Sequence, residues 1–159
     1  MKSSDKEMNK RDIIESINIR TLLDVSIDAA FLISNEFKLI ALNKEALRRI
    51  KKNNPELKKK PLSYFIGKDL AQFYPSDFLR EVNKFRKLVF KNNKPERFKY
   101  NLNGRILDII GYPITDKDNP CCNFAVYSRD ITNEVEADNK AKKNEEKFRN
   151  LIDQMHEGF

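Results

Sequence analysis

Residues 97–110 carry a pattern of side chains that permits little besides a β-hairpin. Apolar and polar residues alternate in the first half of this segment, and the dipeptide Asn103-Gly104 follows. Alternation with a period of two is typical of a half-buried strand, and Asn-Gly is the preferred two-residue turn between antiparallel strands. A two-residue turn also sets the register, so Leu102 should face Arg105 and the next pairs follow from it. The side chains that we expect on the inner face of this hairpin are Phe98, Tyr100, Leu107 and Ile109.

Three more strands are expected around this hairpin. Two short apolar runs, 28–34 and 37–43, are separated by Asn35-Glu36 and predict a tight hairpin near the start of the chain. Residues 123–129 predict the last strand. With the helices between them, this order predicts an α+β domain, built as a five-stranded antiparallel sheet with helices on one face.

Helical patterns fill the remaining segments. Residues 1–21 predict an N-terminal amphipathic helix, 44–52 a short helix, and 76–91 a longer helix with Ser76 as its N-terminal cap. After the last strand, residues 134–147 predict a charged helical connector. Residues 148–159 then repeat a pattern from near residue 20, since Arg149-Asn-Leu-Ile-Asp resembles Arg20-Thr-Leu-Leu-Asp.

The element order and five short motifs together resemble a PAS domain of the S-box type, over residues 22–133. The motifs are Asn43 at the end of the second strand, Gly67-Lys68-Asp69-Leu70, the Asn103-Gly104 hairpin, Pro113-Ile114-Thr115-Asp116 and Arg129-Asp130-Ile131-Thr132. Residues 148–159, with the few residues before them, resemble the lead-in helix of a second PAS domain. The resemblance therefore implies a multi-PAS signalling protein, in which this domain precedes another PAS domain and an effector.

The resemblance implies a sensory and dimerisation module of a prokaryotic signal-transduction protein, with a sensor histidine kinase as the favoured parent. Two alternatives stay open. One is a ligand-free spacer for protein interaction and signal relay, and the other is the regulatory domain of a cyclic-dinucleotide enzyme or a DNA-binding regulator. Residues 22–133 contain no histidine, the commonest general base, so no enzymatic activity is expected of this segment.

The resemblance implies that a small ligand would lie between the sheet and the helices. Strand alternation and the apolar face of the long helix predict a pocket for a small uncharged or amphipathic ligand. Its candidate residues are Asn43, Phe85, Val89, Phe98, Tyr100, Leu107, Ile109, Phe124, Val126 and Ser128. The same residues are equally typical of a packed core, and Asn43 is equally typical of a helix N-cap.

The sequence does not identify a cofactor, but it disfavours haem and a flavin attached to cysteine. Haem-binding PAS domains need an iron ligand on the long helix, and residues 78–91 contain no histidine. Flavin photosensors of the family carry a reactive cysteine in a helical motif, whereas Cys121-Cys122 are expected just before the last strand. No metal site is expected.

Asp130 and Thr132 lie where the last strand passes into the connector, and the resemblance implies that this junction relays the signal. A carboxylate or hydroxyl at a helix start can accept hydrogen bonds from the free N–H groups there. An ordinary cap without a switching role is the alternative.

The expected partners are a second copy of the chain and the downstream domains. The N-terminal helix and an outer apolar stripe of Ile106, Ile110 and Tyr112 are the candidate dimer surfaces.

A net charge of +7 raises the question whether the chain binds nucleic acid. No groove-reading motif accompanies the basic runs, so no nucleic-acid partner is expected. No segment approaches the length of a membrane span, which predicts a cytoplasmic location and leaves a membrane anchor elsewhere in the parent open.

Overall fold

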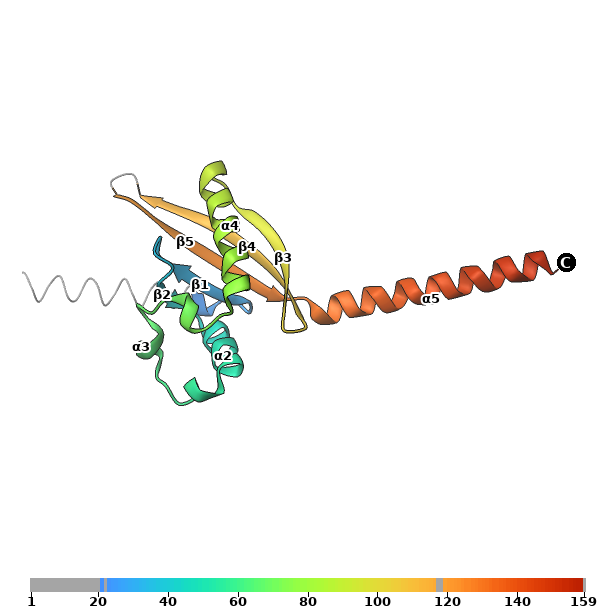
Figure 1. Cartoon of the computed structure of the whole chain (residues 1–159), viewed down its shortest axis with the longest axis horizontal. Helices are drawn as coiled ribbons and strands as arrows, with labels where there is room; N and C mark the ends of the chain where they lie inside the picture. The colour runs from blue at the N-terminus through green and yellow to red at the C-terminus, as the bar shows by residue number, and fades with distance from the viewer. Residues whose placement is uncertain (1–20, 22, 117–118, 159) are drawn as a thin grey trace, which may run out of the picture.

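A five-stranded antiparallel sheet forms the frame of the computed structural model, which describes residues 21, 23–116 and 119–158. The spatial order is β2-β1-β5-β4-β3, so the first and last strands of the chain lie side by side in the middle of the sheet (Figure 1). The strands are β1 (Ala29–Ile33), β2 (Leu39–Leu42), β3 (Glu96–Leu102), β4 (Arg105–Asp116) and β5 (Asn119–Asp130). The predicted α+β class and sheet are confirmed. The predicted N-terminal helix falls almost wholly outside the described residues.

The β3–β4 hairpin has the register that the sequence predicts. Leu102 pairs with Arg105, and the pairs continue along both strands to Glu96 and Gly111. Asn103 and Gly104 have φ angles of 52° and 81°, as a turn of this kind requires. Phe98, Tyr100, Leu107 and Ile109 consequently share the inner face of the sheet.

The helices between the strands cover that inner face (Figure 1). They are α2 (Lys44–Asn53), α3 (Leu62–Phe65) and α4 (Ser76–Asn92), with short 3-10 turns at Pro55–Leu57 and Leu70–Gln72. The buried side of α4 consists of Phe78, Val82, Phe85 and Val89, spaced at three to four residues as one helix face demands.

Two local predictions were wrong. Pro75 rather than Ser76 occupies the N-cap of α4, and no side chain caps that end, because Ser76 is already the first helical residue. β5 begins at Asn119, four residues earlier than predicted, so Cys121-Cys122 lie within the strand rather than before it. The sequence also predicts a turn at residues 117–120, of which 117 and 118 lie outside the described residues and Asn119 begins β5. The first residues of β5 pair with the end of β4, beyond the last pair that β4 forms with β3. Pro113 interrupts the apolar pattern of β4 in that part of the strand. Alternation therefore did not reveal this extension of the two strands.

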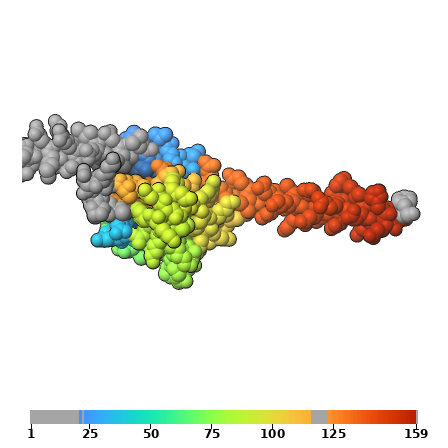
Figure 2. Space-filling model, turned by 90° about the horizontal axis from the view of Figure 1, so that it is seen from above, coloured from blue at the N-terminus to red at the C-terminus, as the bar shows by residue number. Residues whose placement is uncertain are grey.

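The last element, α5 (Thr132–Glu157), extends away from the domain as a single rod (Figures 1 and 2). It contains the predicted connector, and it runs without a break into the segment that resembles a second lead-in helix. Its seam of Phe148, Leu151, Ile152 and Met155 is exposed. None of the described helices combines the length and the apolar character that crossing a membrane requires.

Candidate functional site

The inner face of the sheet divides into a packed half and a hollow half. In the packed half, the ring of Phe85 lies 4.5 Å from that of Phe98 and 5.9 Å from that of Phe124, measured between centroids. Phe124 and Val89 are fully buried beside them. This half is an aromatic core, and none of these four side chains lines the cavity of the other half.

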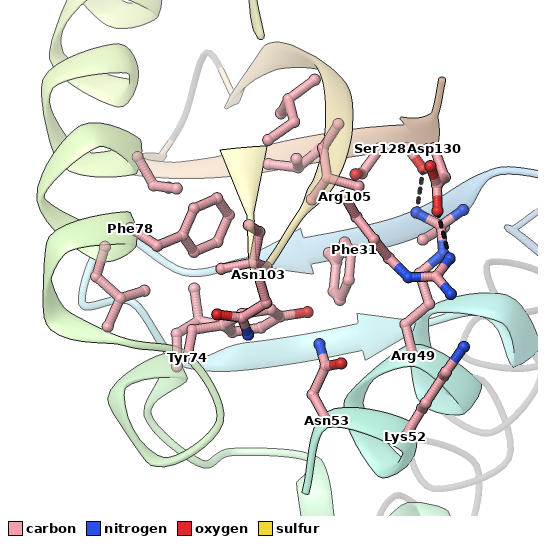
Figure 3. A pocket seen from close by; sticks show the side chains of 18 of the residues that line it. Phe31, Arg49, Lys52, Asn53, Tyr74, Phe78, Asn103, Arg105, Ser128 and Asp130 are labelled. Atoms are coloured by element: carbon pink, nitrogen blue, oxygen red, sulfur yellow. Dashed lines mark hydrogen bonds and ion pairs between the residues drawn. The ribbon is translucent and has the colours of Figure 1, made fainter. Parts of the chain in front are cut away.

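The hollow half contains a cavity of about 130 Å³ between β1, β4 and β5 of the sheet and the helices α2 and α4 (Figure 3). Its interior is apolar. The apolar side chains that line it are Ala29, Phe31, Ile33, Leu70, Phe78, Leu79, Val82, Leu102, Leu107, Ile109 and Val126. Tyr74 closes one side, with its ring 5.3 Å from that of Phe78.

Polar groups gather at one end of the cavity, and most of them are exposed to solvent there. They come from the second turn onward of α2, from the hairpin turn and from the end of β5. The residues are Arg48, Arg49, Lys52, Asn53, Asn103, Arg105, Ser128 and Asp130. We call this group the mouth of the cavity.

Glu45 holds two of the mouth arginines in place. Its carboxylate accepts hydrogen bonds from Arg48 at 2.8 Å and from Nε of Arg49 at 2.7 Å. The hydrogen bond from Arg48 has the largest effect on the pKa of Glu45. Together with that from Arg49 it outweighs the effect of partial burial and lowers this pKa to about 2. Arg49 also donates from Nη1 to the carbonyl oxygen of Ser128 at 2.9 Å, which ties α2 to β5 (Figure 3).

Tyr74 is the one titratable group in the wall of the cavity rather than at its mouth. Burial raises its pKa well above the ordinary value for tyrosine, with only a small opposing effect from Arg49. The hydroxyl is therefore protonated at any physiological pH and can donate a hydrogen bond. No hydrogen bond to this hydroxyl is found among the described residues.

The mouth continues directly into the start of α5. Arg105 donates from Nη1 to Oδ2 of Asp130 at 2.6 Å, while Oδ1 of Asp130 accepts from the backbone N–H and the hydroxyl of Thr132 at 3.1 and 2.5 Å. The Thr132 hydroxyl oxygen accepts in turn from the N–H of Ile106 at 3.0 Å. Partial burial raises the pKa of Asp130, but the hydrogen bonds from Thr132 and the ion pair with Arg105 dominate and lower it to about 2.

The predicted pocket residues divide among four places. Leu107, Ile109, Val126 and Ser128 line the cavity, whereas Phe85, Val89, Phe98 and Phe124 belong to the packed half. Tyr100 packs on Phe78, and its hydroxyl donates to Asp77 at 3.3 Å. Asp130 and Thr132, the residues predicted to relay the signal, are hydrogen-bonded to each other at the junction of β5 and α5.

Asn43 is the N-cap of α2, and it does not line the cavity. Its Oδ1 accepts from the N–H groups of Ala46 and Ala30, at 2.9 and 3.0 Å. Its amide nitrogen donates to the carbonyl oxygens of Asp28 and Leu23, at 2.8 and 3.0 Å. This side chain joins β1, α2 and the segment before β1, which is a structural role.

Sequence reasoning missed the cationic mouth, although two signals for it were present. Arg49 and Lys52 are three residues apart and so lie on one face of their helix, whereas the sequence alone suggested a solvated basic run. The hairpin register also places Arg105 on the same face as Leu107 and Ile109. Among the described residues, no three histidine, cysteine, aspartate or glutamate side chains are grouped as metal ligands.

The fold is shared with solved structures of signalling domains, whereas no protein-family model and no curated protein match the sequence. The PAS domain of Bordetella pertussis BvgS is 18% identical, with a TM-score of 0.58 over 84% of this chain and 98% of that one. A domain of an HTR-like protein from Haloarcula marismortui is also 18% identical, with a TM-score of 0.56 over 67% of this chain and 100% of that one. A sensory box sensor histidine kinase from Vibrio cholerae is 12% identical, with a TM-score of 0.52 over 81% of this chain and 98% of that one. The chain has the PAS fold.

Proposed function

We propose that this chain, whose fold is that of PAS domains, is a sensory module that binds a small molecule in its cavity and passes the state of the cavity to α5. The favoured setting is a sensor histidine kinase, because solved domains of such kinases share the fold. A second PAS domain beginning within α5 and a homodimer belong to the same proposal.

One observation carries the proposal. Arg105 and Asp130 line the cavity and form an ion pair, and the Asp130 carboxylate also accepts hydrogen bonds from Thr132, the first residue of α5. A ligand that draws Arg105 toward itself weakens its ion pair with Asp130, and the hydrogen bonds at the first turn of α5 change with it. Ligand binding in the cavity and the structure of the first turn of α5 are thereby coupled through two contacts, Arg105 with Asp130 and Asp130 with Thr132.

The relay is tested in the full-length protein that contains this sequence. We expect Asp130→Ala to change ATP-dependent autophosphorylation by severalfold while the domain stays folded. Asp138→Ala removes the same charge from an exposed site farther along α5, where no partner is found among the described residues, and should leave autophosphorylation unchanged. Unchanged phosphorylation in Asp130→Ala, with the domain still folded at the assay temperature, would contradict the relay and favour an ordinary helix cap.

Ligand binding is tested by native mass spectrometry of the purified chain. We expect a species heavier than the polypeptide by the mass of one small molecule, and we expect Val82→Phe to remove it, because the larger side chain fills the cavity. The alternative function, a spacer that binds proteins and no ligand, predicts the bare polypeptide mass for both chains. The cavity itself favours the first of the two, since a spacer needs a solid core only.

A further inference from the structure

The charges at the mouth restrict the chemical class of the ligand. Resting on the proposed function, we propose that the cavity binds a small carboxylate, with an apolar body inside and the carboxylate at the mouth between Lys52 and Arg105. Figure 3 shows both side chains at the same end of the cavity, together with Arg49.

The size of the cavity limits the apolar body. A comparable apolar cavity of about 150 Å³ in another protein accepts one molecule of benzene. The cavity here, at about 130 Å³, therefore accommodates a single ring or a short branched chain, with the head group outside it. Larger ligands such as haem or a flavin ring system do not fit without rearrangement of α2 or α4.

The interior excludes a second charge on the ligand. Phe31, Phe78, Val82 and Ile109 offer no hydrogen-bonding group, and the single Tyr74 hydroxyl in the wall cannot replace the hydration shell that an ion placed among them would lose. The ligand consequently carries its charge at one end only.

The sign of that charge follows from the balance at the mouth. Four cationic side chains line it, Arg48, Arg49, Lys52 and Arg105, and only Glu45 and Asp130 form ion pairs with them among the described residues. Two positive charges are therefore in surplus, and Lys52 has no ion pair in the described part of the chain. Arg105 is exposed and uses a single N–H on Asp130, so the rest of its guanidinium can donate to an incoming carboxylate.

Three probes with the same ring test the sign of the charge: 3-phenylpropanoate, 3-phenylpropan-1-ol and 3-phenylpropylammonium, each titrated onto the purified chain by calorimetry. We expect the carboxylate to bind roughly tenfold more tightly than the alcohol, because it gains charge-assisted hydrogen bonds, and the ammonium to bind most weakly.

Lys52→Gln tests the position of the head group. It should weaken carboxylate binding about threefold, as expected for a partly solvated ion pair, and leave alcohol binding unchanged. Lys44→Gln removes the same charge from the other end of α2, outside the cavity, and should change neither. Both lysines are exposed, so both variants should fold.

Equal affinity for the carboxylate and the alcohol, or an unaffected Lys52→Gln, would overturn the carboxylate assignment. In that case, if the probes bind to the wild type and not to Val82→Phe, the cavity would still be supported as a ligand-binding site. If none of the three probes binds, the carboxylate assignment fails and the ligand-binding part of the proposed function is contradicted with it.

Discussion

Gly111 lies on the inner face of β4, against two phenylalanine rings. A Cβ atom added there would be 2.5 Å from Cε2 of Phe124 and 2.6 Å from Cε1 of Phe85, and both rings are buried. Neither ring can move freely, because the two pack on each other, Phe85 packs on Phe98, and Phe124 packs on Phe90. The absence of a side chain at this position is therefore required by packing rather than by backbone conformation.

We expect Gly111→Ala to lower the free energy of unfolding by about 1–3 kcal/mol, the usual cost of overpacking a core. Urea denaturation followed by circular dichroism measures it. Gly158→Ala is the matched control, since a Cβ there meets no atom closer than 3.5 Å. A Gly111→Ala variant as stable as the wild type would mean that the aromatic half is looser than described.

Asn43 satisfies backbone groups on three segments at once. Removing its side chain uncaps α2 and leaves the N–H of Ala30 and the carbonyl oxygen of Asp28 without their partner. We expect Asn43→Ala to cost about 2–4 kcal/mol in urea denaturation, from the lost cap and the unsatisfied buried groups. Asn53→Ala, at an exposed site on the same helix, should cost under about 0.5 kcal/mol.

At the scale of elements, the junction of β5 and α5 depends on pH through Asp130. Its pKa is about 2 in the folded chain and roughly 4 when unfolded, so the folded state prefers the ionised carboxylate. The stabilisation by the Asp130 carboxylate is therefore complete well above pH 4 and is lost as the pH falls toward about 2.

This dependence is measured as a difference between two chains, because Glu45 and Asp108 also have lowered pKa values. We expect the wild type to be more stable than Asp130→Asn at about pH 6, and this difference to shrink progressively below about pH 4. Urea titrations at several pH values give both curves. A difference that stays constant over this range would show that the ionised carboxylate does not contribute.

At the scale of the whole molecule, α5 projects from the domain (Figure 2). Its apolar seam is exposed. Phe148, Leu151 and Met155 follow the spacing of a coiled-coil seam, and 58% of Leu151 is exposed. A helix of 26 residues without tertiary contacts along that seam gains stability from a partner helix.

We expect the chain to dimerise with increasing concentration in analytical ultracentrifugation, and Leu151→Asp to shift the equilibrium to monomer by at least tenfold. Asn150→Asp adds the same charge one residue away, off the seam, and should leave the equilibrium nearly unchanged. A wild-type chain that stays monomeric at high concentration would contradict a dimer through α5.

Much of the fold was predictable from the sequence because its determinants are local. Alternation and the Asn103-Gly104 turn define the β3–β4 register, and helical spacing defines the buried face of α4. The end of α4 and the start of α2 likewise follow from nearby residues. Such patterns depend on neighbours within a few positions, which a sequence displays directly.

The division of the inner face into a packed half and a cavity was decided only by tertiary structure. Phe98 and Ile109 face each other in the sheet and were predicted to line one pocket, yet Phe98 packs against Phe85 and Ile109 borders the cavity. The cationic mouth also depends on distant segments, because Arg49 and Lys52 reach the same cavity as Arg105 only when α2 packs on the sheet. Volume and charge at a site are sums over residues far apart in the chain, and no local pattern encodes such sums.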